Sequence, residues 1–202
     1  NDMLVDCTFR VSGKVPQLWH PDTGLVTRDV SYRSKGDGTQ VTLPLSPGGS
    51  AFVVFGDKFD SDAPAIRPRE LLSQVLAVTG PWTLRFPKGW GAPAESTFET
   101  LSSWTDSPVE GIKYFSGTVE YTKSINIPAD ALGRGEALYL DLGDVRELAE
   151  VYLNDTSLGV LWKPPFRVDL GSVARPGKNE LRIEVVNLWI NRLSGDLLLP
   201  PE

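Results

Sequence analysis

Short segments in which apolar and polar residues alternate recur along the whole chain. Residues 118–127 show the pattern most clearly, with apolar side chains on one face, polar ones on the other and Lys123 as the single exception. The apolar positions are Val119, Tyr121, Ile125 and Ile127. A period of two is typical of a β-strand with one buried face, because successive side chains point to opposite sides of the sheet.

The same pattern predicts strands throughout both halves of the chain. In the first half we expect strands at residues 4–11, 25–32, 41–45 and 51–55, separated by turns at 19–24, 34–39 and 46–50. Residues 51–55 form an apolar run of the length expected for a buried strand. In the second half we expect strands at residues 82–86, 96–101, 118–127, 136–142, 149–155, 158–166, 166–173 and 181–189.

The spacing of these segments predicts an all-β fold in two parts. After position 80, no stretch of about ten residues shows clean helical periodicity. Polar, proline-bearing residues at 56–70 are the best candidate for a linker, and residues 70–78 fit either a helical turn or a strand. The predicted organisation is therefore a small β-sandwich or meander at 1–62, a linker and leading strand at 63–79, and a jelly-roll β-sandwich at 80–202.

Composition and charge exclude some classes of partner but identify none. Hydrophobic residues make up 41% of the 202 residues, which is enough for a buried core. The net charge of −6 would repel a phosphate backbone, so we expect no nucleic acid partner. No apolar run approaches the roughly 20 residues that span a membrane. The single cysteine, Cys7, excludes an internal disulfide.

Candidate catalytic chemistry is sparse. His20 is the only histidine and lies in a His-Pro-Asp turn, where a surface position is more typical than a general base. Glycoside hydrolysis needs two carboxylates a few ångströms apart, and none of the 26 acidic residues stands out as half of such a pair. We therefore predict no catalytic residue in this chain.

A metal site is not predicted either. One histidine and one cysteine cannot build a zinc site from those ligand types. Asp57, Asp60 and Asp62 have a spacing that resembles an oxygen-ligand calcium loop, but a solvated acidic linker explains them more simply. We expect no cofactor, with structural calcium at these aspartates as the alternative.

Aromatic residues carry more information, because five of the six tryptophans lie in the second half. Tryptophan both stacks on the apolar faces of sugars and fills the cores of β-sandwiches. Trp82 and Trp189 fall in strand patterns, which indicates a structural role. Trp90, Trp104 and Trp162 fall in predicted loops, where binding residues concentrate, and Trp162 is the best binding candidate.

Four motifs in the second half resemble a known family. They are GPWTLRF at 80–86, LSSWTDSPVEGIKYFSGTVEYTK at 101–123, EVYLNDTSLGVLWKPPFRVDL at 150–170 and VVNLWINRLSGD at 185–196. In this order they resemble the C-terminal β-sandwich region of α-L-rhamnosidases of glycoside hydrolase family 106. The fold implied for that region is a galactose-binding-like jelly roll, similar to the sugar-binding domain of glycoside hydrolase family 2. The first half resembles the β-rich region before that sandwich. Ser-Gly-Asp at 194–196 departs slightly from the Ile-Gly-Asp expected there.

The resemblance implies a context as well as a fold. In that family the catalytic acids belong to an upstream (β/α)₈ barrel, so none is carried over to this chain. We expect that barrel as a partner, a rhamnose-containing or other plant or microbial oligosaccharide as the ligand, and a secreted or periplasmic location. The first strand and the last residues look cut, which fits a fragment of a longer enzyme.

We hypothesise a sugar contact on two neighbouring stretches. Trp162, Lys163 and Phe166 would form one loop of the substrate site, and Asn187, Asn191 and Arg192 would lie beside it; arginine and asparagine side chains suit sugar hydroxyls. Alternatively, the double proline at 164–165 merely ends a strand, and Arg192 pairs with Asp196 or a neighbouring acid.

Three functions remain open from the sequence. The first is a non-catalytic accessory domain that packs on the catalytic barrel of a rhamnosidase-like hydrolase and shapes its substrate site. The second is a free-standing carbohydrate-binding module. The third is a purely structural or interaction domain. Sugar binding by the isolated chain would favour the second.

Overall fold

The chain divides into two compact units, Asn1–Ser73 and Gln74–Glu202. The computed structural model describes residues 3–22, 24–46, 48–57, 76–132 and 137–200. Most of the predicted linker and the helix-or-strand segment at 70–78 fall outside the described residues, as do Asp60 and Asp62. The domain limits at 62 and 80 therefore stay predictions.

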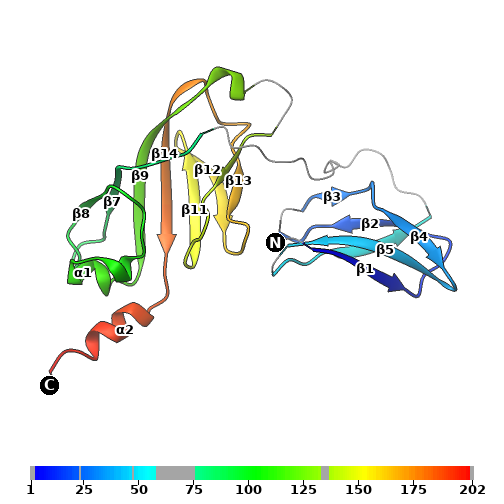
Figure 1. Ribbon diagram of the computed structural model, residues 1–202, viewed down its shortest axis with the longest axis horizontal. Helices are drawn as coiled ribbons and strands as arrows, with labels where there is room; N and C mark the ends of the chain where they lie inside the picture. The colour runs from blue at the N-terminus through cyan, green and yellow to red at the C-terminus, as the bar shows by residue number, and fades with distance from the viewer. Residues whose placement is uncertain (1–2, 23, 47, 58–75, 133–136, 201–202) are drawn as a thin grey trace. The chain divides into compact units, whose positions relative to one another are not determined.

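The first unit consists of two three-stranded antiparallel sheets, in the orders β1-β5-β4 and β3-β2-β6 (Figure 1). The strands are β1 (Met3–Phe9), β2 (Val15–Trp19), β3 (Val26–Thr27), β4 (Tyr32–Lys35), β5 (Gly38–Leu45) and β6 (Phe52–Gly56). Their shared core is Leu18, Val30, Val41 and Leu43. Burial alternates from Val41 to Leu45, as the predicted period of two requires, whereas Gly38–Val41 at the start of β5 are all buried.

Several predictions for this unit were wrong in detail. The predicted strand 25–32 is a two-residue β3 and a separate β4, and the turn predicted at 34–39 narrows to Gly36–Asp37. Strand β2 was missed, because Pro16 argues against a strand. Among the described residues β3 pairs only with Leu18 and Trp19, so Pro16 has an edge-like position. Strand β6, expected to be buried, is at least partly exposed along its length.

The second unit contains eight strands in its described part, as the sequence predicts. Six of them form an antiparallel sheet in the order β12-β11-β14-β9-β7-β8, and β10 and β13 pair separately. The strands are β7 (Trp82–Arg85), β8 (Glu95–Phe98), β9 (Thr118–Ile127), β10 (Tyr139–Asp141), β11 (Leu148–Leu153), β12 (Thr156–Leu161), β13 (Arg167–Asp169) and β14 (Gly177–Val186). Side chains from both sheets share one core, so the arrangement is a β-sandwich.

Alternation along the strands builds this core. In β11, Ala149, Val151 and Leu153 have no exposed surface, while the residues between them are partly exposed. In β9, Val119 and Tyr121 are buried as the sequence predicts. Strand β9 agrees with the predicted limits at both ends.

An aromatic cluster closes the core near the start of β9. Trp104 lies in a 3₁₀ turn, η1 (Trp104–Asp106), and packs edge-on against Phe86 and Phe115. Its indole Nε1–H donates to the hydroxyl of Tyr121. Trp104 is buried and acts in packing, the role that the sequence had left open beside binding.

At the opposite end of the sheet, Asn154 and Asn179 form hydrogen bonds that connect two turns. Asn154 and Asp155 have positive φ angles of 50° and 64°, which form the tight β11–β12 turn that the sequence predicts. The Asn179 amide, only 1% exposed, accepts from Asn154 Nδ2 and from the Arg175 backbone N–H. It donates to the carbonyls of Arg175 and Gly177. One buried amide thus joins two turns.

Two short helices and the end of β14 differ from the prediction. Helix α1 (Glu110–Lys113) precedes β9, and α2 (Ile190–Asp196) follows β14. The strand predicted at 181–189 begins earlier, at Gly177, and ends at Val186. A second 3₁₀ turn, η2 (Ala129–Ala131), follows β9. Helices of four and seven residues are too short to give a clear helical period in the sequence.

The Asn179 network gives a stability prediction. Asn179→Ala leaves the Arg175 N–H without its acceptor and removes one of the two acceptors of the Asn154 amide, which costs about 2–4 kcal/mol of unfolding free energy. The matched control is Glu180→Ala, which removes a surface ion pair with Lys178 and should cost less than about 1 kcal/mol. Urea unfolding followed by tryptophan fluorescence measures both, and equal losses would contradict the assignment.

Tyr121 gives a pH prediction. Burial raises the pKa of Tyr121 from 10.0 to about 12, against the smaller opposing effect of its hydrogen bond with Trp104. From pH 10 to 12 the unfolded chain loses this proton while the folded chain keeps it. The unfolding free energy should therefore be unaffected by Tyr121 below pH 10 and fall above it by up to about 1.4 kcal/mol per pH unit.

Tyr121→Phe is the control for this titration. It removes the acceptor of Trp104, which lowers stability at every pH, but it also removes the ionisable group. Unfolding at a series of pH values should give a shallower decline above pH 10 for Tyr121→Phe. Parallel curves would show that other groups cause the decline.

Candidate functional site

The pairing register brings both stretches of the predicted sugar site to one end of the six-stranded sheet. Leu161 at the end of β12 pairs with Ala149 on β11, and Ala149 pairs with Val185 on β14. Residues 162 and 187 follow directly after these strand ends, so they begin two strand spacings apart, roughly 10 Å.

Close backbone contacts add the Trp90 loop and both helices to this end. A Cβ on Gly111 of α1 would lie 2.0 Å from the Gly91 carbonyl oxygen, and one on Gly195 of α2 would lie 2.8 Å from Tyr114. A Cβ on Gly91 would lie 3.9 Å from Arg192 Nη1. The loop that carries Trp90 therefore packs beside α1 and α2, which lie at the same end of the sheet in Figure 1.

Trp162 is the predicted residue best placed to meet a ligand. Its side chain is 57% exposed, and the Lys163 ammonium lies 5.4 Å from the centre of its ring. The chain then passes through Pro164–Pro165 into β13, where Arg167 holds Asp141 on β10 at 2.5 Å. This ion pair anchors the strand that follows the loop.

Phe166 and Asn187 are used within the fold. Phe166 is 6% exposed, and its backbone carbonyl accepts from the Leu142 N–H. The Asn187 side chain accepts from the Gly117 N–H and donates to the Phe115 carbonyl, each at 2.9 Å. This amide fastens the end of β14 to the segment that leads into β9.

Asn191 and Arg192 lie on helix α2 instead of in a loop. Arg192 Nε lies 2.9 Å from Asp196 Oδ1, one turn along the helix, which is the pairing that the alternative reading of the sequence predicts. The backbone N–H of Arg192 donates to Ser116 Oγ. Asn191 is partly buried. Sugar contact by the six predicted residues stays a prediction.

Trp189 is the residue that the sequence assigned wrongly. It was placed in a strand and given a structural role, but it precedes α2 and is 76% exposed. Trp90, between two glycines of positive φ, is 55% exposed. Trp82, in contrast, is buried in the core as predicted. Three exposed tryptophans, Trp90, Trp162 and Trp189, therefore lie at one end of the sandwich.

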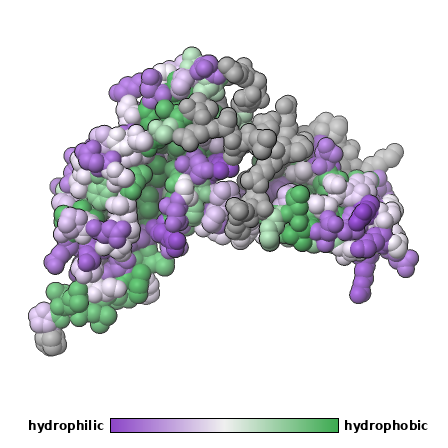
Figure 2. Space-filling view, in the orientation of Figure 1, coloured by the Kyte–Doolittle hydropathy of each residue, from purple (hydrophilic) through white to green (hydrophobic). Residues whose placement is uncertain are grey.

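A nearly continuous series of exposed apolar side chains runs through α2 and the residues around it. We call it the apolar strip; its members are Leu188, Trp189, Ile190, Leu193, Leu197, Leu198 and Leu199. No residue of α2 is buried. Figure 2 shows the resulting hydrophobic surface at the end of the second unit. Apolar patches of this kind mark interaction sites more often than free surface.

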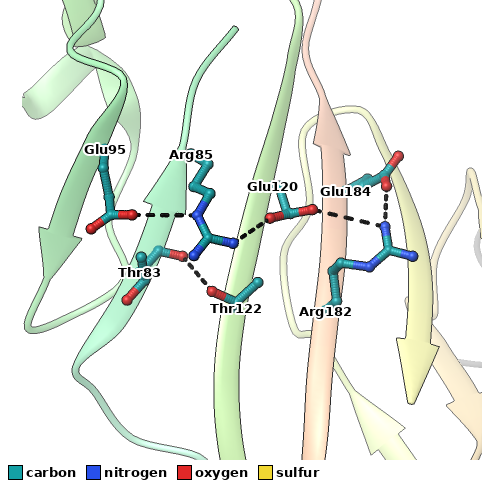
Figure 3. Close-up of polar contacts among 7 residues, drawn as sticks. All are labelled: Thr83, Arg85, Glu95, Glu120, Thr122, Arg182 and Glu184. Carbon is teal, nitrogen blue, oxygen red and sulfur yellow. Dashed lines mark hydrogen bonds and ion pairs between the residues drawn. The ribbon is translucent and has the colours of Figure 1, made fainter. Parts of the chain in front are cut away.

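The outward face of the six-stranded sheet is polar and differs from this end. Cross-strand partners bring Glu120 opposite Glu184, and Glu184 opposite Glu150, which would repel one another. Two arginines relieve the repulsion (Figure 3). Arg85 lies 3.1 Å from Glu120 and 3.3 Å from Glu95, and Arg182 pairs with Glu184 and lies 4.0 Å from Glu120.

The arginines and glutamates of this outward face form a ladder in which the charged groups pair with one another. The hydrogen bonds that Arg85 donates to Glu120, and next to Glu95, raise the pKa of Arg85. Arg182 stacks 3.6 Å from the centre of the Tyr152 ring, and the hydrogen-bonded Glu150 raises the pKa of Tyr152. Since each charge already has a partner on the sheet, the ladder stabilises strand pairing and offers little to a ligand.

The Asp141 carboxylate is paired within the fold. A hydrogen bond from Arg167 lowers the pKa of Asp141 and keeps it ionised, the opposite of what a general acid needs. Within the described ranges, no three His, Cys, Asp or Glu side chains come together as a metal site. Helices long and apolar enough to span a membrane are absent from the same residues.

Comparison with known proteins relates the chain to glycoside hydrolases. The structure of a rhamnosidase from Novosphingobium sp. PP1Y superposes on the whole chain with a TM-score of 0.82 and 36% identity. A curated protein from Formosa agariphila with the provisional name β-glucuronidase is 42% identical over 127 residues, or 63% of the chain. No protein-family model matches.

The chain corresponds to a minor part of each relative. It covers 19% of the rhamnosidase and 11% of the Formosa protein. A β-glucuronidase from Ruminococcus gnavus aligns over 55% of the chain at 22% identity and a TM-score of 0.46, too weak a similarity to carry weight. The chain is therefore related to portions of glycoside hydrolases, with an all-β sandwich fold.

The contact between Gly111 and Gly91 gives a test of how the Trp90 loop is held. Gly111→Ala should push this loop away from α1 and cost about 1–3 kcal/mol, because the obstructing atom is backbone. In protein labelled with 5-fluorotryptophan, the ¹⁹F resonance of Trp90 should move. Glu110→Ala, an exposed change on the same helix, should leave it in place. An unmoved resonance in Gly111→Ala would contradict the contact.

Proposed function

We propose that this chain is the non-catalytic accessory β-sandwich portion of a glycoside hydrolase of the α-L-rhamnosidase type. The observation that carries the proposal is the similarity of the entire chain to a rhamnosidase, at a TM-score of 0.82 and 36% identity. The chain covers 19% of that protein, which supports an accessory role rather than a complete enzyme.

The local chemistry supports a role without catalysis. A glycosidase needs one carboxylic acid that holds its proton and a second carboxylate nearby. At the end of the sheet, Asp144 and Asp196 each lie against an arginine, Arg146 and Arg192 respectively. Each of these carboxylates therefore has a charged partner within the chain. This portion needs no cofactor in the proposed role.

The apolar strip supports docking onto a catalytic domain. Stable protein interfaces have an apolar centre and a polar rim. The strip supplies the apolar centre, and the Arg192–Asp196 pair supplies charged neighbours on the same helix. In the proposed assembly the strip faces a (β/α)₈ barrel of the parent chain, and burial of Trp189 and Leu197 contributes most of the binding energy.

Trp162 and Lys163 are the proposed contribution to the substrate site. The exposed indole offers a flat apolar face for a sugar ring, and the ammonium beside it offers donors to sugar hydroxyls. With the strip against the barrel, this loop would line one wall of the pocket for a rhamnose-containing oligosaccharide. A secreted or periplasmic location is part of the proposal, because such substrates lie outside the cell.

Hydrolysis assays test the proposal. The 202-residue chain and the full-length product of its gene are compared on p-nitrophenyl α-L-rhamnopyranoside and on a rhamnose-containing oligosaccharide. We expect turnover by the longer protein alone. Trp162→Ala in that protein should raise KM for the oligosaccharide about tenfold with little change in kcat, since it removes binding to a remote part of the substrate.

Val160→Ala is the matched control, because Val160 is exposed to a similar degree on the adjoining strand β12. It should leave KM unchanged. Hydrolysis by the 202-residue chain would overturn the non-catalytic role. A longer protein without activity on either substrate would overturn the hydrolase assignment.

A further inference from the structure

The sheet formed by β3, β2 and β6 in the first unit has an apolar outward face. Its inward side chains Leu18, Val53 and Phe55 belong to the core of the unit. Because neighbouring residues of a strand point to opposite sides of the sheet, the residues between them face away from that core. We call this surface the Trp19 face; its side chains are Val15, Gln17, Trp19, Val26, Phe52 and Val54, and none is charged.

The strand register places Trp19 in the middle of this face. Trp19 lies directly opposite Phe52 on β6 and Val26 on β3. The Trp19 side chain is 45% exposed and that of Phe52 is 63% exposed. The indole Nε1–H donates to Gln17 Oε1 at 3.2 Å, and Gln17 is itself 4% exposed. The polar group of the indole is therefore satisfied within the chain, and the part that reaches the surface is hydrocarbon.

The other sheet of the same unit has an outward face of the opposite kind. Val41 and Leu43 on β5 fill the core, so Asp6, Gln40 and Thr42 face outward. These three residues line a small polar hollow and hydrogen-bond to one another. A polar outward face is typical of an antiparallel sheet that meets water. The Trp19 face lacks this character and has the composition of a surface that is covered by a partner.

The size of the Trp19 face restricts what can cover it. Three strands and the five residues of β2 give a face of roughly 15 Å by 17 Å, or about 250 Å². A stable interface between separate proteins buries about 800 Å² on each partner. The face is therefore too small to hold a free protein or a second copy of the chain. An occupant on the same chain needs less area, because the covalent connection supplies a high effective concentration.

We propose that the Trp19 face docks on the catalytic part of the parent glycoside hydrolase. This inference rests on the proposed function, and it adds a contact in the first unit that is separate from the apolar strip of the second. The chain covers 19% of the similar rhamnosidase, so most of that protein lies outside it and can supply the occupant. The matching surface would be apolar and uncharged, with Trp19 and Phe52 as the central contacts.

Hydroxyl-radical footprinting, read by mass spectrometry of peptides, tests the inference. The 202-residue chain and the full-length product of its gene are oxidised under the same conditions. Trp19 and Phe52 should react at least about fivefold more slowly in the longer protein, because the centre of an interface excludes water. Tyr32, which is 46% exposed on β4 of the same unit, is the internal control and should react equally in both proteins.

A charge placed on the face gives the matching variant. Phe52→Lys in the full-length protein should return the oxidation rate of Trp19 to the rate in the 202-residue chain, because an unpaired charge cannot be buried in an apolar contact. Tyr32→Lys, an equal change at an exposed aromatic residue away from the face, should leave Trp19 protected. If circular dichroism shows that Phe52→Lys does not fold, Phe52→Ser replaces it and should also raise the oxidation of Trp19.

Several outcomes would overturn the inference. Equal reactivity of Trp19 in the two proteins, or equal slowing of Trp19 and Tyr32, would reject docking through this face. Protection of Trp19 in the 202-residue chain at raised protein concentration would indicate a second copy as the occupant. Protection there by the rhamnose-containing oligosaccharide would indicate a glycan.

Hydrolysis of the rhamnoside, measured on the same samples, separates this inference from the proposed function. An active longer protein in which Trp19 stays reactive overturns the docking of the Trp19 face alone. An inactive longer protein in which Trp19 is protected supports the docking and overturns the hydrolase assignment.

Discussion

The pairing of β9 with β14 is the constraint on which the rest of the second unit depends. Ten residues of each strand pair in an unbroken antiparallel register, from Gly177 opposite Ile127 to Val186 opposite Thr118. A shift by one residue would turn every buried side chain outward, so the apolar face that these strands share fixes the register. Strands β7 and β11 then add to its two sides, and each extends both the core and the polar face.

This register also decides where chemistry can occur. On the outward face, Arg85 pairs with Glu120 across β7 and β9, and Arg182 pairs with Glu184 within β14, so these charged groups are already paired on the sheet. At the end where β14 stops and β9 starts, Asn187 ties the two segments together, and α2 leaves the sheet with its apolar residues exposed. Exposed apolar side chains are therefore concentrated at this end of the sandwich, while the paired charges of the outward face hold its strands together.

The two units present different kinds of surface. The second unit has the apolar strip and an exposed tryptophan close by, which in the proposed function meet a catalytic domain and its substrate. On one of its sheets the first unit has a small polar hollow in which Gln40 donates a hydrogen bond to Asp6. Similarity to a rhamnosidase extends across both units, and the chain covers 19% of that protein.

The sequence by itself determined the all-β class, strand β9 with its buried face and the Asn154–Asp155 turn. It also identified Trp162 and Arg192 as side chains whose chemistry suits a sugar. These features depend on local periodicity and on the conformational preferences of single residues. Tertiary structure decided the rest. Phe166 became buried, Asn187 became a fastening between distant segments, and Trp189 turned outward before a short helix. Each outcome depends on partners dozens of residues away in the chain, which no local pattern records.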